Sequence, residues 1–171
     1  TVRLGKLRYK VDIESNADPE EFFNLDPLLQ ENGEAAGQVV ECKNLPDMDP
    51  NGKTYVKVYI MSGIHPELKT KNIKNNLTPV YNEDFSFVVS IIHNSLDRIH
   101  AIDKLVIFVA VPNDVRKKTI VLQVYDKDTI GKEDGIGEIQ IPLWQEDLDI
   151  ETDNTMELST VSKGKDNKPV L

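Results

Sequence analysis

The sequence predicts an all-β fold, an antiparallel β-sandwich. Most segments alternate apolar and polar residues with a period of two, which is the pattern of a half-buried strand. Turn-forming residues separate these segments, and few stretches have a helical period. At 171 residues the chain has the size of one domain and can bury a core.

Seven segments carry the strand pattern. In the first, Leu7, Tyr9, Val11 and Ile13 share one face and charged residues occupy the other. The later segments are rich in β-branched residues or alternate in the same way, and Pro, Gly and Asn lie between them. The predicted strands are residues 4–13, 38–42, 55–60, 85–89, 105–111, 119–125 and 137–143.

Two connections are longer than a plain sandwich needs. Residues 14–37 are acidic, and Asp18-Pro19 is a typical start for a short helix. The second connection is residues 90–108, whose part 91–102 fits a short helix or a loop. We expect a single domain over residues 1–160, with both connections as inserts or long loops, and a flexible tail over residues 161–171.

Composition excludes several function classes. The formal net charge of -9 argues against nucleic acid as a partner, because phosphate backbones require clustered Lys and Arg. No apolar run is long enough to span a bilayer, and a lone cysteine, Cys42, favours the cytoplasm. No nucleophile elbow, phosphate loop or zinc-protease motif is present, so we expect a non-catalytic module.

Two acidic loops carry the strongest functional signal. Asp47-Met48-Asp49-Pro50-Asn51-Gly52 precedes one predicted strand, and residues 126–134 follow another. Clustered carboxylates are either a solvated turn or oxygen ligands for a hard cation such as Ca²⁺. The first loop matches the first half of an EF-hand, but Val58 stands where the bidentate Glu is needed and the flanks are strands.

Four ordered blocks of the chain resemble C2 domains of the synaptotagmin and protein kinase C type. They are the opening strand 4–9, the loop and strand 44–58, the stretch 69–85 with Leu77-Thr78-Pro79-Val80-Tyr81-Asn82-Glu83, and residues 124–138. The resemblance covers about residues 4–160. It implies an eight-stranded antiparallel Greek-key β-sandwich, with calcium loops at one end that bind acidic phospholipids.

The resemblance also implies site residues. The calcium ligands would be Asp49, Asp126, Asp128 and Asp134. A lipid-binding surface is implied at Tyr55, Lys57, Lys69, Lys71 and Tyr125, with Ile130 inserting into the bilayer from the tip of the second acidic loop. Ca²⁺ would be the cofactor, and phosphatidylserine, with phosphoinositides as a second class, would be the partner of a peripheral membrane protein.

One departure from the family pattern leaves a rival hypothesis open. The family has an Asp-Pro-Tyr triplet before the third strand, where this chain has Lys53-Thr54-Tyr55, so one carboxylate is lost beside a new lysine. Fewer carboxylates reduce calcium affinity. The rival is a calcium-independent C2 fold that binds a protein partner, with the long connections as its contact surface.

Overall fold

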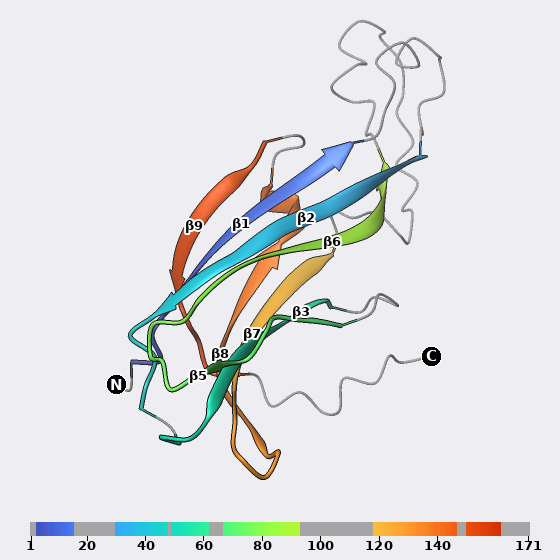
Figure 1. Cartoon of the computed structure of the whole chain (residues 1–171). Helices are drawn as coiled ribbons and strands as arrows, with labels where there is room; N and C mark the ends of the chain where they lie inside the picture. The colour runs from blue at the N-terminus through green and yellow to red at the C-terminus, as the bar shows by residue number, and fades with distance from the viewer. Residues whose placement is uncertain are drawn as a thin grey trace, which may run out of the picture.

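The chain folds as two antiparallel sheets that pack into a β-sandwich (Figure 1). The computed structural model describes residues 3–15, 30–47, 49–61, 67–92, 118–146 and 150–161. The strands are β1 (Lys6–Ser15), β2 (Gln30–Lys43), β3 (Lys53–Ile60), β4 (Leu68–Lys69), β5 (Ile73–Lys74), β6 (Val80–Ile92), β7 (Thr119–Lys127), β8 (Glu133–Pro142) and β9 (Thr152–Glu157). A short 3₁₀ helix, η3 (Leu143–Gln145), follows β8.

The first sheet has the strand order β6-β2-β1-β9. Its β1 strand follows the predicted alternation, since Leu7, Tyr9, Val11 and Ile13 are all buried in the core. β2 lies between β1 and β6, and at Gly37 the Phe85 ring of β6 lies so close that a Cβ would meet it at 2.6 Å. A central strand tolerates this close approach only at glycine.

The second sheet has the order β4-β3-β7-β8, with β5 also paired to β3. β4 pairs with Lys57 and Val58, and β5 pairs with Lys53 and Thr54, so the two short strands continue each other along the same edge of β3. Between them the Val56 amide donates to Thr70 Oγ1 at 2.9 Å. β4 and β5 are thus one strand interrupted by a bulge, and on this basis the described residues form eight strands.

The core lies between the sheets and is almost entirely aliphatic and aromatic. β3 contributes Val56, Val58 and Ile60, as their alternation predicts. β7 contributes Ile120, Leu122 and Val124. The predicted all-β sandwich is therefore confirmed.

The boundaries of the long connections differ from the prediction. β1 reaches Ser15 and β2 begins at Gln30, so both ends of the segment 14–37 belong to the sheet. β6 likewise continues through Ile92, into the predicted connection 90–108. Pairing across β1, β2 and β6 imposes strand structure on sequence with weak β propensity. Residues 91 and 92 of the predicted helix or loop 91–102 are therefore strand. The rest of that segment, the predicted helix start at Asp18-Pro19, the strand 105–111 and all of the tail but its first residue lie outside the described residues.

Candidate functional site

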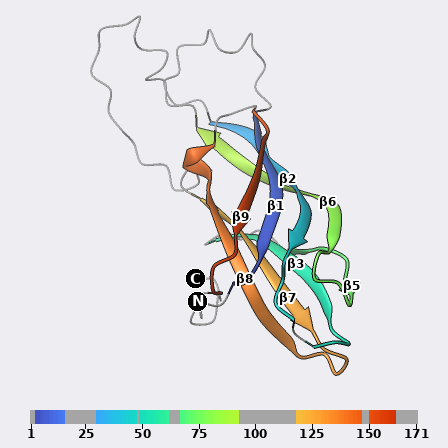
Figure 2. The ribbon, with the colours of Figure 1, turned by 90° about the vertical axis from the view of Figure 1, so that its left-hand side faces the viewer.

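The two acidic loops lie at the same end of the second sheet. We call the loop before β3 loop one (residues 44–52) and the turn between β7 and β8 loop three (residues 128–132). Strand register brings them together, because Thr54 of β3 pairs with Asp126 of β7, and Asp126 pairs in turn with Asp134 of β8. Figure 2 shows the β7–β8 hairpin beside the start of β3 at this end.

Asp126 is at the centre of this arrangement. Its side chain is only 5% exposed, and its Oδ2 accepts a hydrogen bond from the Asp49 backbone amide at 3.3 Å. The carboxylate also rests on Gly52, where a Cβ would lie 2.2 Å from Asp126 Oδ1. Burial raises the pKa of Asp126, and the negative charges of Asp49, Asp134 and Asp128 raise it further, against the opposing effect of the Asp49 amide.

The structure thus brings the four predicted ligands into one electrostatic neighbourhood. Their side chains are not yet placed to coordinate one ion, since the described residues contain no cluster of three or more His, Cys, Asp or Glu side chains arranged to hold a metal ion. Met48 of loop one lies outside the described residues.

The carboxylates of Asp49 and Asp128 instead accept hydrogen bonds from backbone amides of their own loops. Asp49 Oδ1 accepts from the Asn51 amide at 2.9 Å. Asp128 Oδ1 accepts from the amides of Ile130 at 3.0 Å and Lys132 at 2.7 Å. Such side-chain to backbone bonds fix the two loops as turns and leave a second oxygen on each carboxylate.

The predicted lipid-binding residues form a second cluster, on the outer face of the same sheet. Tyr55 and Tyr125 stack with their ring centroids 5.7 Å apart and an interplanar angle of 16°. Lys57 Nζ lies 4.3 Å from the Tyr125 centroid, and Lys69 Nζ lies 5.9 Å from that of Tyr55. Among the described residues, no ion pair or ring contact joins Lys71 to this cluster, and its backbone amide donates to the Glu83 carboxylate.

Two acidic residues that the sequence did not single out neutralise this cluster. Lys57 Nζ lies 3.4 Å from Glu133 Oε2, and Glu67 lies 3.9 Å from both Lys57 and Lys69. The neighbouring Tyr55 hydroxyl and the Lys57 ammonium lower the pKa of Glu133. Lys57 and Lys69 are therefore already paired, which the sequence pattern could not show because the acids come from distant segments.

Buried hydrogen bonds fix the ring of Tyr125. Its hydroxyl donates to Gln123 Oε1 at 3.0 Å, and Gln123 Nε2 donates to Glu138 Oε2 at 2.9 Å. Gln123 and Glu138 are 5% and 3% exposed. The sequence alone could not link these two residues to Tyr125, because Gln123 and Glu138 become neighbours only through the pairing of β7 with β8.

Ile130 lies at the tip of loop three and is 88% exposed. The turn beneath it is built on Gly131, whose φ is +90°. The Asp128 carboxylate holds the Ile130 amide, so the apolar side chain is presented to solvent by a fixed turn. This is the position that the sequence predicted for an inserting residue.

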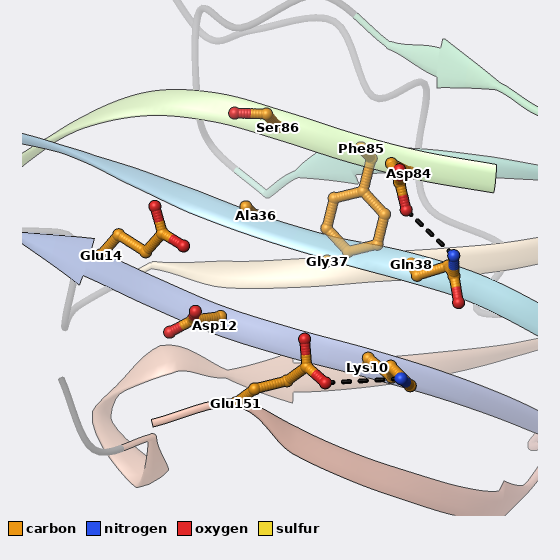
Figure 3. A pocket seen from close by; sticks show the side chains of 10 residues that line it. All are labelled: Lys10, Asp12, Glu14, Ala36, Gly37, Gln38, Asp84, Phe85, Ser86 and Glu151. Atoms are coloured by element: carbon orange, nitrogen blue, oxygen red, sulfur yellow. Dashed lines mark hydrogen bonds and ion pairs between the residues drawn. The ribbon is translucent and has the colours of Figure 1, made fainter. Parts of the chain in front are cut away.

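A separate hollow of about 410 Å³ lies on the first sheet, away from the acidic loops (Figure 3). Its floor is the Phe85 ring over Gly37, and its walls carry several carboxylates. Glu151 pairs with Lys10 at 3.4 Å, and Asp84 accepts from Gln38 at 3.0 Å.

Comparison with known proteins identifies the family. The C2 domain family model matches residues 34–101 and 103–158. Synaptotagmin-1 of Caenorhabditis elegans is 29% identical over 149 residues, and that of Homo sapiens is 27% identical over 168 residues. These matches cover 86% and 97% of this chain, but only 26% and 31% of the relatives. The chain thus spans about a quarter to a third of the length of these synaptotagmins.

Solved structures agree on the fold. A crystal structure of a C2 domain of RIM from Drosophila superposes with a TM-score of 0.59 at 18% identity, over 93% of this chain and all of that one. In the part of the chain that the structure describes, no helix has the length and apolarity to cross a bilayer. With the sandwich, the two loops and the family match together, the chain belongs to the C2 domain family.

Proposed function

We propose that this domain binds acidic phospholipid membranes in response to Ca²⁺. The observation that supports this most is that the charges of Asp49, Asp128 and Asp134 all act on the buried carboxylate of Asp126. Holding like charges together costs free energy unless a cation offsets the repulsion. The donor set is all oxygen, which suits Ca²⁺.

Each of the four residues has a separate role in the proposal. Asp126, the buried residue, would provide the inner ligand, and Asp128 and Asp134 would close loop three around the ion. Asp49 would add an oxygen from loop one. A bound Ca²⁺ supplies positive charge that offsets the carboxylates and open coordination positions for lipid phosphate oxygens.

The loop geometry supports a site in which Asp49 and Asp128 reach a Ca²⁺ ion by small rotations of their side chains. Asp49 and Asp128 each use one carboxylate oxygen to hold a turn, so the second oxygen remains for an ion while the turn persists. Lys53 replaces a family carboxylate and lowers the number of ligands. We therefore expect weaker calcium binding than a site with the full set of aspartates would have.

Calcium binding in solution tests this part of the proposal. An ion that binds only the folded state raises the melting temperature as its concentration rises. We expect such a rise with CaCl₂ and a much smaller one with MgCl₂, because Mg²⁺ retains its waters. A melting temperature that stays constant up to millimolar calcium, without lipid, would mean that the ion needs lipid phosphate as a ligand or does not bind.

Ile130→Ser should weaken calcium-dependent membrane binding. Burying an isoleucine side chain contributes about 1.5–3 kcal/mol, so we expect roughly a tenfold to hundredfold loss of vesicle affinity. Calcium binding in solution should not change, because Ile130 contributes only its backbone amide to the loop. Ile150→Ser, at an exposed residue just before β9, is the matched control. Equal losses in both variants would exclude insertion of loop three.

Glu133→Gln should strengthen binding to anionic vesicles in the absence of calcium. The change removes the ion pair between Lys57 and Glu133 and makes the net charge of the sheet face that carries Tyr55 and Tyr125 more positive by one. We expect about a fivefold gain, the effect of roughly one additional basic charge near an anionic surface. Glu157→Gln, on β9, makes the same charge change elsewhere. A gain no larger than that of Glu157→Gln would mean that this face does not meet the membrane.

A further inference from the structure

The chain leaves β9 and crosses from the first sheet to the second. The Leu158 amide still donates to the carbonyl of Gly5, just before β1, at 2.9 Å. One residue later, Ser159 pairs with Glu138 of β8 in an antiparallel bridge, with backbone hydrogen bonds of 2.8 and 3.0 Å in the two directions. Figure 1 shows the chain passing from β9 towards β8. We call residues 158–161 the strap.

The strap runs along the edge of β8 towards loop three. Because the bridge at Glu138 is antiparallel, successive residues of the strap lie beside successively earlier residues of β8. Val161 accordingly lies against Gly135, where a Cβ would come within 2.9 Å of Val161 Cγ2. The residue before Gly135 is Asp134, one of the proposed calcium ligands. The strap therefore reaches the base of the calcium site.

Two glycines of β8 make room for the strap. A Cβ at Gly137 would lie 2.8 Å from Leu158 Cβ, and one at Gly135 would lie 2.9 Å from the Val161 side chain. Neither glycine has a positive φ, so the backbone conformation does not require them. A glycine inside a strand often marks the close approach of another segment. The sequence of β8 thus suits a strap in direct contact with it.

The base of loop three lies where the pairing of β8 is weakest. β8 is the last strand of its sheet, and β7 is its strand neighbour in the described structure. A bulge interrupts the pairing of these two strands between Val124 and Tyr125 of β7. The strap contacts β8 on either side of this interruption, at Glu138 and at Gly135. It therefore supports the strand where the β7–β8 ladder is broken.

We propose that the strap positions loop three and thereby couples calcium binding to the chain beyond residue 161. With the strap docked, β8 is held on both edges and Asp134 stays opposite Asp126. With the strap released, only the bulged pairing with β7 holds the base of the loop. A ligand or force that lifts the strap lowers calcium affinity, and calcium favours the docked strap by the same factor. This inference rests on the proposed calcium site and adds its regulation.

Calcium titration of three variants tests the coupling. Val161→Gly removes the side chain that lies against Gly135, and Val161→Ile keeps it. Thr160→Gly is the matched control, because it adds the same backbone freedom at an exposed neighbouring residue. We expect Val161→Gly to lower calcium affinity at least about fivefold, the lower end of typical coupling, and the other two to stay close to the natural sequence. Equal affinities in Val161→Gly and Thr160→Gly would overturn the inference.

Hydrogen exchange provides the reciprocal measurement. The Ser159 amide donates to the Glu138 carbonyl at 3.0 Å, so it exchanges when the strap is released. Saturating calcium should slow this exchange at least about fivefold. The control is the Leu143 amide, which donates to the Lys118 carbonyl at 3.0 Å beyond the other end of β8 and should slow less. Equal slowing at both amides would mean that calcium stabilises the whole domain, and it would overturn the coupling.

A measurement in chelator separates this inference from the proposed function. The Asp128 amide closes loop three by donating to the Lys132 carbonyl at 2.9 Å. Without calcium, it should exchange faster in Val161→Gly than in Thr160→Gly. That result, in a natural sequence that binds no calcium, would support the hold of the strap on loop three and refute the calcium site. Calcium binding by the natural sequence, with equal exchange and equal affinity in the two variants, would support the calcium site and refute the strap.

Discussion

Asp126→Asn/Asp128→Asn should abolish the calcium response of membrane binding. The change removes two of the four carboxylate charges, including the buried one whose pKa the other three raise. Asparagine keeps the size and one acceptor oxygen, so the loop hydrogen bonds at Asp128 can persist. We expect at least a hundredfold loss of calcium affinity, on the order of tenfold for each charged ligand removed. Calorimetric titration with CaCl₂ measures it.

The same variant should be at least as stable as the natural sequence when calcium is absent. The raised pKa of Asp126 means that the fold disfavours its ionised form, and removing that charge relieves the repulsion. The control is Asp47→Asn/Asp84→Asn, which changes two exposed carboxylates outside the predicted ligand set. A double variant at Asp126 and Asp128 that keeps its calcium response would refute the assigned ligands.

Gly52→Ala should disrupt the site through a single methyl group. The added Cβ would lie 2.2 Å from Asp126 Oδ1 and 2.9 Å from its Cγ, so the buried carboxylate must move. Overpacking of this kind typically costs about 1–3 kcal/mol of stability. We expect that loss in chemical denaturation, together with at least roughly a tenfold weaker calcium affinity, because the inner ligand is displaced.

A double-mutant cycle identifies the cause of that loss. Asp126→Ala removes the atoms that Gly52→Ala would clash with, so the combined variant should recover most of the stability lost by Gly52→Ala alone. Additive losses in the combined variant would show that the methyl group disturbs something else, such as the turn in which the Gly52 amide donates a hydrogen bond to the Asp49 carbonyl at 2.8 Å.

Much of the fold is readable from the sequence because both sheets bury one face. Leu7, Tyr9, Val11 and Ile13 alternate with charged residues, and all four are buried as predicted. The N-terminal half of β2 could not be predicted in this way. Its residues 33–37 are small or polar, and they form a strand because β1 and β6 pair with both of its edges.

The candidate site was partly predictable for a similar reason. The acidic loops are local in sequence, so Asp126, Asp128 and Asp134 could be grouped before the fold was known. The pairing of Lys57 with Glu67 and Glu133 depends on the register between separate strands.

Cosedimentation with phosphatidylserine vesicles at physiological salt, in calcium and in chelator, tests the central claim most directly. We predict that the domain pellets with vesicles in calcium and largely stays in the supernatant in chelator, since the aspartates of the two loops then repel an anionic surface. Equal pelleting in both conditions would contradict calcium control of membrane binding. Absence from the pellet in both conditions would contradict membrane binding itself and favour a protein partner.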